Sequence, residues 1–282
     1  MFGINRQSYY RSIKRVRKRQ SIAQQVVDLV HKIRVHQKRI GTRKLYYLLH
    51  KELQELKVGR DKFFEILRAN HLLIIPKRSY HTTTMSHHRF RKHPNLTKEL
   101  IINRPNQVWV SDITYIGKRE KPCYLSLITD AYSKKIVGFE VSNTMCTKEM
   151  VKALKMALKQ RKTKESLIHH SDRGIQYCCD EYQYCLTKHQ IKCSMTENSD
   201  PYENAIAERI NGILKQEFMI DTYHLDLHLM KKLVAESIFI YNNDRPHWSN
   251  HMQTPNQMHQ KDNVKYRTYK TKNSSNLIAT TV

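Results

Sequence analysis

The sequence is short of acidic residues, has no long apolar run and contains no C-x-x-C cysteine pair. Its 282 residues include 25 Asp and Glu against 50 Lys and Arg. No segment is apolar enough for a membrane-spanning helix, and the first residues lack the apolar core of a signal peptide. None of the six cysteines precedes Cys123. These absences argue against a membrane-spanning protein and a disulfide framework, and they favour reduced thiols in the cytosol.

What the sequence has in excess is positive charge, with a formal net charge of +25. Residues 1–20 carry seven Lys or Arg and no acid, and residues 66–98 carry seven Lys or Arg, five His and no acid. An excess of this size indicates a polyanionic partner, and DNA or RNA is the usual one, bound through phosphate contacts and counterion release. An acidic membrane surface is the alternative. The length and the 39% apolar content allow two modest domains with a buried core.

The first residues of the chain predict a break between two helices. Residues 1–20 have the pattern of a turn followed by a short helix capped by Asn5. This segment is interpreted as either the second half of a helix-turn-helix or a solvated basic arm. Ser21 and Gln24 form a capping-box pattern, which predicts a new helix over 21–34.

Two further short helices are expected within 21–75, opened by Gly41 and Gly59 and each carrying basic residues in its first turn. Two short helices joined by a turn fit a helix-turn-helix DNA-binding unit, and a plain three-helix bundle is the alternative. A polar, basic linker follows over 76–104 and either lies along DNA or is simply solvated. The DNA contacts predicted in this part of the chain are Arg43, Lys44, Arg60 and Lys62.

Residues 105–260 have the pattern of an α/β domain. Three strand-like runs are followed by alternating helix and strand, which predicts a sheet of mixed direction. From Lys261 to Val282 the chain is polar and basic and is expected to fray. The predicted strands cover 108–116, 122–130, 135–141, 166–170 and 191–196, and the predicted helices begin near 147, 179, 203 and 226.

Three acids of this domain stand where a metal site is plausible. Asp112 shares a strand face with Val110 and Thr114, Asp172 follows a strand, and Glu208 lies on a helix with 35 residues between it and Asp172. Carboxylates hold hard cations such as Mg²⁺ or Mn²⁺, and two such ions can clamp the reacting oxygens of a phosphoryl transfer. The alternatives are a salt-bridged strand Asp, a turn Asp and a solvated Glu.

Lys215 lies two turns after Glu208 on the same helix face, where a cation can hold DNA phosphate. The alternative is a solvated lysine on an amphipathic helix.

The motifs around these acids resemble those of the DDE transposases of bacterial insertion sequences. They are the segments Trp109–Tyr115, His170–Tyr177 and Ser199–Arg209. The most similar group has a retroviral-integrase-type core encoded in a second reading frame. Its triad has the same 35-residue second gap and a Lys or Arg seven residues after the glutamate. Its late Tyr-Asn…Arg-Pro-His element matches Tyr241–His247, and 35–90 looks like the helix-turn-helix segment that precedes its core.

The resemblance implies a ribonuclease-H-like catalytic core, Mg²⁺-dependent cleavage at the ends of the element and strand transfer by the freed 3′-hydroxyl. It implies insertion-sequence ends and target DNA as partners, a homo-oligomer on DNA, the product of an upstream frame as a further partner, and a nucleoid-associated place in the bacterial cytoplasm. Cys179 and Glu203 depart from the usual residues of the group. Asp112, Asp172 and Glu208 would be the catalytic metal ligands, and Asn204, Lys215, Arg245 and His247 would contact DNA.

Two other functions use the same residues. A structure-selective or RNA-strand nuclease would need similar carboxylates, but not the helical segment at 35–70 or a lysine placed as Lys215 is. A DNA-binding regulator, with an inert core or as a truncated partner of a longer transposase, would need no catalysis. The three intact acids favour the DNA-joining enzyme.

Overall fold

Neither glycine nor proline interrupts the chain between Asn5 and Gln37, and a single long helix forms there. The computed structural model describes residues 5–75, 93–117, 122–197 and 204–266. In it α1 spans Arg6–His36, and the Asn5 side chain accepts a hydrogen bond from the Gln7 amide at 3.1 Å, which confirms the predicted cap. The predicted helix start at Ser21 is wrong, because Ser21 accepts from Gln25 within the continuous helix.

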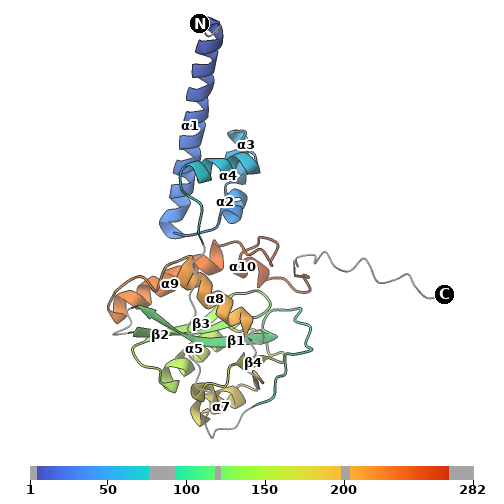
Figure 1. Cartoon of the computed structure of the whole chain (residues 1–282). Helices are drawn as coiled ribbons and strands as arrows, with labels where there is room; N and C mark the ends of the chain where they lie inside the picture. The colour runs from blue at the N-terminus through green and yellow to red at the C-terminus, as the bar shows by residue number, and fades with distance from the viewer. Residues whose placement is uncertain (1–4, 76–92, 118–121, 198–203, 267–282) are drawn as a thin grey trace, which may run out of the picture.

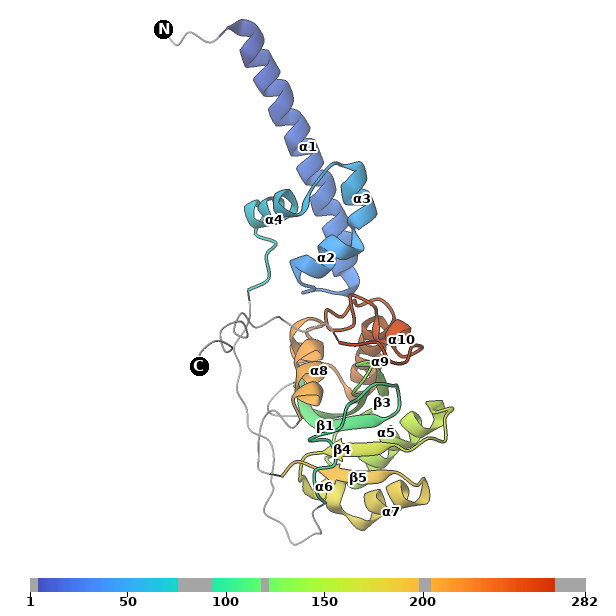
Figure 2. The same cartoon turned by 90° about the vertical axis from the view of Figure 1, so that its right-hand side faces the viewer.

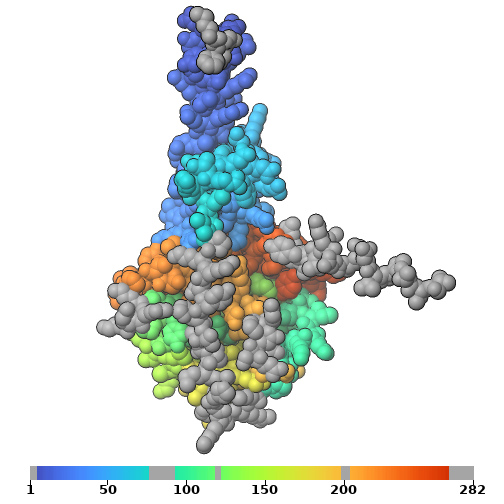
Figure 3. Space-filling view, viewed as in Figure 1, coloured from blue at the N-terminus to red at the C-terminus, as the bar shows by residue number. Residues whose placement is uncertain are grey.

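Three short helices pack against the second half of α1, while its first half stands clear of them (Figures 1 and 3). The predicted openings at Gly41 and Gly59 are confirmed, since each glycine is the N-cap of a helix. A short additional helix lies between them. The helices are α2 (Thr42–Leu48), α3 (His50–Glu55) and α4 (Arg60–Ala69), and their core includes Val26, Val30, Leu45, Leu53, Phe63 and Leu67.

The second part of the chain is built on a five-stranded sheet of order β3-β2-β1-β4-β5. β1 is antiparallel to β2 and parallel to β4, so the predicted mixed direction is confirmed. This mixed five-stranded sheet is consistent with the ribonuclease-H-like core that the sequence resemblance implies. Its strands are β1 (Val108–Gly117), β2 (Pro122–Asp130), β3 (Ile136–Ser142), β4 (Ile168–Ser171) and β5 (Lys192–Met195).

Helices cover both faces of this sheet (Figures 1 and 2). Trp109 and Val137 pack with α5 (Thr147–Gln160) and α7 (Asp180–Lys188) on one face, beside the short α6 (Ile175–Cys178). Leu125 and Leu127 pack with α8 (Ala205–Gln216) and α9 (Leu227–Asn243) on the other face. Figure 2 shows α8 and α9 between the sheet and the N-terminal helices. Helix α8, which carries Glu208, therefore lies directly on the sheet.

Residues on both sides of the predicted core are fastened to it. The Met195 amide donates to the Pro94 carbonyl, and the Leu96 amide donates to Ser194 Oγ at 2.9 Å. Tyr266 donates to the Tyr132 carbonyl at 2.9 Å. Residues 93–104 therefore pack with the core instead of serving as linker, and the expectation of fraying from Lys261 is wrong for 261–266. The rest of the predicted linker and tail lies outside the described residues.

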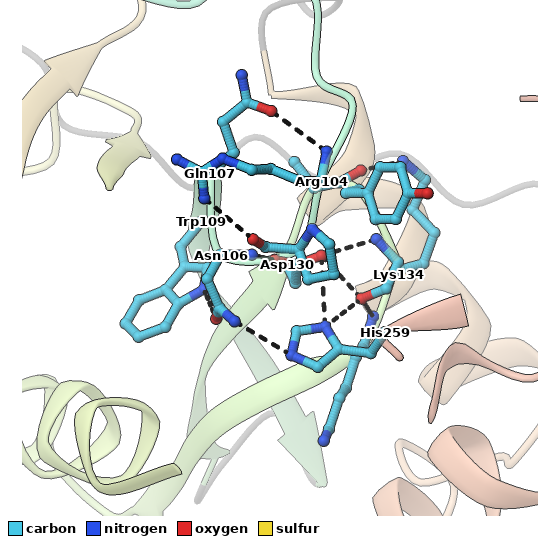
Figure 4. Close-up of polar contacts among 12 residues, drawn as sticks. Arg104, Asn106, Gln107, Trp109, Asp130, Lys134 and His259 are labelled. Carbon is cyan, nitrogen blue, oxygen red and sulfur yellow. Dashed lines mark hydrogen bonds and ion pairs between the residues drawn. The ribbon is translucent and has the colours of Figure 1, made fainter. Parts of the chain in front are cut away.

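Asp130 is a buried carboxylate at the end of β2, and its hydrogen bonds connect β2 with residues before and after it in the chain (Figure 4). It accepts from the Asn106 amide at 2.6 Å and from the Ser133 hydroxyl at 2.8 Å, and a His259 ring nitrogen lies 2.9 Å from that hydroxyl. The serine proton is directed at the aspartate, so the histidine must donate to the serine, which is the reverse of a hydrolase triad. We conclude that this Ser-His-Asp group ties α10 (Pro255–Met258) to the sheet and has no nucleophile.

Candidate active site

Asp112 and Asp172 lie side by side because β1 and β4 run in parallel. Ser111 is opposite Ser171 in their register, so the next residue on each chain is one of the two acids. Asp172 is the first residue after β4, and active sites of open α/β sheets favour such carboxyl ends of strands. The Asp172 carboxylate also accepts from the Gly174 amide at 3.0 Å, so the turn role considered for it is present as well.

Helix α8 lies over Asp112. Asn211 donates its side-chain amide to Asp112 Oδ2 at 2.7 Å, and Asn204 donates to the Ser111 carbonyl at 3.4 Å. Glu208 lies three residues before Asn211 and Lys215 four residues after it, so the three share one face of the helix. The side chain of Glu208 is exposed and that of Lys215 is half-buried.

The electrostatics at Asp112 reflect all three acids. Burial is the main cause that raises the pKa of Asp112 to about 7, and the negative charge of Asp172 acts in the same direction. Glu208 contributes a smaller effect of the same sign, while the hydrogen bond from Asn211 opposes the shift. A carboxylate that is desolvated and repelled by its neighbours is stabilised by a divalent cation.

The carboxylate donors at this position suit a hard cation, although they do not form a complete set of metal ligands. Within the described ranges, no three His, Cys, Asp or Glu side chains are close enough together to hold a metal ion. Mg²⁺ in phosphoryl-transfer sites is commonly held by one or two carboxylates together with substrate phosphates. Asp112 and Asp172 offer such a pair, and Asp112 is bonded by a neutral amide that leaves its charge uncompensated. The residues therefore fit Mg²⁺ or Mn²⁺, with Glu208 as the most exposed donor.

Lys215 is placed close to this site. Burial lowers the pKa of its ammonium, and the negative charges of Asp221 and Asp112 act against that shift. Asn204 is buried and bonded to the backbone of β1. Asn204 therefore connects the start of α8 to the strand that carries Asp112, and its predicted contact with DNA stays a prediction.

A buried polar network supports the two strands from the opposite face. The Tyr177 hydroxyl lies 2.9 Å from Ser111 Oγ, and the Tyr182 hydroxyl lies 2.9 Å from His169 Nε2. Burial raises the pKa values of both tyrosines and lowers that of His169 to about 3. These groups are therefore neutral, and they fix the residues that precede Asp112 and Asp172 without adding charge to the site.

Three predicted DNA contacts are used inside the protein instead. Glu217, at the end of α8, accepts from Arg245 Nη2 at 2.8 Å and from Lys44 Nζ at 2.9 Å. Arg245 is 1% exposed, and the buried His247 lies 2.9 Å from the Tyr241 hydroxyl. Burial and the charges of Arg245 and Lys44 lower the pKa of His247, which keeps its ring neutral. Lys44 and Arg245 are thus engaged by Glu217, and His247 by Tyr241, so their predicted contacts with DNA have no support from this structure.

The same Glu217 joins the two parts of the chain. Its carboxylate bonds Lys44 of α2, and its carbonyl accepts from the Arg39 amide at 3.0 Å. The N-terminal helices are therefore docked on the C-terminal end of the helix that carries Glu208 and Lys215. The other basic residues predicted to bind DNA in this segment, Arg43, Arg60 and Lys62, are exposed and stay predictions.

Sequence reasoning did not single out two residues of this region. Asn211 follows Glu208 by three residues, and its spacing was the available signal for a contact with the same site. Glu217 lies nine residues after Glu208, and its partners are distant in the sequence, so only the tertiary structure shows its role.

Comparisons with known proteins identify the family of the chain. Two family models match the chain, both described as "Integrase core domain", over residues 102–201 and 189–255. The chain is 34% identical over 254 residues to the "Insertion element IS600 uncharacterized 31 kDa protein" of Shigella sonnei, covering 88% of this chain and 92% of that protein. It is 34% identical over 153 residues to "Transposase InsF for insertion sequence IS3A" of Escherichia coli (strain K12), covering 54% and 53% of the two chains.

Solved integrases are similar to the core at low identity. The HTLV-2 integrase catalytic core domain in complex with magnesium has a TM-score of 0.45 and 20% identity, covering 55% of this chain and 97% of that chain. The simian T-cell lymphotropic virus intasome has a TM-score of 0.49 and 18% identity, covering 83% and 80%. Although α1 has 31 residues, neither it nor any other described helix is apolar enough to cross a membrane.

Proposed function

This chain belongs to the IS3 family of insertion-sequence transposases with an integrase core domain, and we propose that it cleaves DNA at the ends of its element and joins them to target DNA. One observation carries the proposal. Asp112 and Asp172 are neighbours on two parallel strands, and the helix above them brings Glu208 near enough to shift the pKa of Asp112. A desolvated carboxylate beside two others is the donor set expected of a metal-dependent polynucleotidyl transferase.

Asp112, Asp172 and Glu208 would hold Mg²⁺ or Mn²⁺ in this proposal. The bound metal supplies charge neutralisation at the reacting phosphate and promotes deprotonation of the attacking water or 3′-hydroxyl. Asn211 orients the Asp112 carboxylate through its 2.7 Å hydrogen bond. The sheet contributes rigidity, because Asp112 lies within a strand paired on both sides.

Lys215 is the DNA contact that its position supports best. Its ammonium lies on the same helix face as Glu208 and is influenced by Asp112, so a phosphate bound beside the carboxylates would be within its electrostatic reach. Arg43, Arg60 and Lys62 are exposed cations of the N-terminal helices, and we include them as contacts to the DNA backbone. Joining two ends to one target needs at least two cores, so the proposal includes a homo-oligomer on DNA and, as a further partner, the upstream-frame protein.

A strand-transfer assay on labelled element ends with Mg²⁺ tests the proposal. We expect nicked and joined products from the native chain, and neither product from Asp172→Asn. Lys215→Ala should bind ends and transfer strands more weakly while the protein unfolds at an unchanged temperature. Cutting without joining would instead indicate a nuclease. A shifted DNA band with no cutting would indicate a regulator, and unchanged activity of Asp172→Asn would refute the assigned site.

A further inference from the structure

A cavity lies behind α8. Its volume is about 360 Å³, within the range of small-ligand pockets. It is formed where α2, α8 and the loop after α9 meet. The residues that line it are Lys44, Lys134, Ala205, Ile206, Arg209, Ile210, Ile213, Arg245, His247, Trp248 and Ser249.

This cavity is separate from the active-site face. Ile206, Ile210 and Ile213 follow each other at helical spacing and line the cavity. Glu208 and Lys215 lie about half a turn away around the same helix, at 100° per residue. One face of α8 therefore lines the cavity, and the opposite face carries the residues of the candidate active site. Arg209 lies at the cavity although it is adjacent to Glu208 in sequence.

Positive charge gathers at the cavity. Lys44, Lys134, Arg209 and Arg245 line it, and no acid does among the residues that the structure describes. Glu217 engages Lys44 and Arg245, and Asp130 acts on Lys134. The guanidinium of Arg209 is exposed, and its charge reaches His247, Lys44 and Tyr241. An anion entering the cavity would meet a positive potential with Arg209 as its most accessible partner.

The cavity also has an apolar and aromatic wall. Trp248 is half-buried there, beside the three isoleucines of α8, and the Ser249 hydroxyl adds a polar group. A purely inorganic anion would leave that wall unused. A phosphate that carries a planar base would use both features, because bases pack on aromatic side chains while their phosphates pair with arginine or lysine.

We propose that this cavity binds one nucleotide unit, with its phosphate at Arg209 and its base against Trp248. The nucleotide belongs either to a DNA strand that crosses from the core to the N-terminal helices or to a free mononucleotide. The proposal deepens the proposed function by giving the family's DNA a second contact, remote from the carboxylates. It requires no metal and no catalysis.

Tryptophan fluorescence gives a direct test. The chain has two tryptophans, and Trp109 is fully buried and donates to Asn106 at 3.1 Å, so a ligand in the cavity acts on Trp248. The Asp172→Asn protein in EDTA is titrated with inorganic phosphate, thymidine 5′-monophosphate and a 5′-phosphorylated trithymidylate. The Trp248→Phe variant shows which part of the fluorescence change comes from Trp248. We expect quenching by the nucleotide probes, weakened about tenfold in Arg209→Gln and partly restored in Arg209→Lys.

The matched control is Arg68→Gln, an exposed helical arginine of α4 far along the chain from the cavity, which should leave the titration unchanged. If the trinucleotide binds more tightly than the mononucleotide, the natural ligand is a DNA strand. If the two bind equally, the natural ligand is a free nucleotide. The proposal is overturned if Arg209→Gln binds as the parent does, if no nucleotide quenches Trp248, or if inorganic phosphate binds as tightly as the nucleotides. Because metal and catalysis are absent, these results do not depend on strand transfer.

Discussion

The Asn211 side-chain amide donates a 2.7 Å hydrogen bond to Asp112 Oδ2, joining helix α8 to the strand that carries this acid of the candidate site. Asn211 is buried, and its amide is neutral, so it fixes the orientation of the carboxylate without compensating its charge. A ligand held in this way remains available to a cation.

Asn211→Ala should weaken Mg²⁺ binding and strand transfer by about 10–100-fold, as loss of an outer-shell partner of a metal ligand usually does. Mg²⁺ affinity is measured by the metal-dependent rise in unfolding temperature, and strand transfer on labelled ends. Gly212→Ala is the control, because it changes the next residue of the same helix where an added Cβ meets nothing within 4 Å. An Asn211→Ala protein with native Mg²⁺ affinity would contradict the role.

The second prediction concerns acid stability. Burial alone would raise the pKa of Glu217, but the hydrogen bonds and charges of Arg245 and Lys44 outweigh it and lower the pKa from 4.5 to about 2. A carboxyl whose pKa is lower in the folded state stabilises the fold above pH 4.5, and this contribution is lost as the pH falls toward 2. It amounts to about 3 kcal/mol. Urea unfolding between pH 5 and 2.5 should show this component in the native chain. A Glu217→Gln variant with the same acid dependence would rule it out.

The third prediction concerns the docking of the N-terminal helices. Lys44→Met leaves Glu217 bonded to Arg245 but removes its link to α2, which should lower the free energy of unfolding by about 2 kcal/mol. Arg43→Met, at the exposed neighbouring position, should have almost no effect. Urea unfolding measures both variants. Hydrogen exchange of the Arg39 amide, which donates to the Glu217 carbonyl, should accelerate in Lys44→Met only; equal exchange in both would show that Lys44 does not hold the junction.

The fourth prediction separates two glycines. A Cβ on Gly138 of β3 would lie 2.2 Å from the Ala153 carbonyl oxygen of α5, so Gly138→Ala must push the helix off the sheet. We expect the free energy of unfolding to fall by about 1–3 kcal/mol or more. Gly212→Ala, inside α8 with open space around the position, should stabilise the protein by about 0.5–1 kcal/mol. Thermal or urea unfolding of the two variants gives the comparison, and a stable Gly138→Ala protein would disprove the close approach.

Local patterns in the sequence determined much of the fold. The helix openings at Gly41 and Gly59 and the strands that begin at Val108 and Pro122 were predictable, because caps and hydrophobic periodicity act within a few residues. The same spacing placed Asp112, Asp172 and Glu208 on a strand, at a strand end and on a helix. The helix start at Ser21 was mispredicted, since a capping pattern does not end a helix unless the chain also contains a breaker.

Only the tertiary structure decided which charges are free. Lys44 and Arg245 look like exposed cations in a basic chain, but both bond Glu217, which comes from a distant segment. The parallel register of β1 and β4 puts Asp112 beside Asp172, and the packing of α8 adds Asn211. The sequence thus determined the residue types and the local elements, because these depend on neighbours in the chain. Burial and pairing depend on contacts between distant segments, which form only when the sheet and its helices assemble.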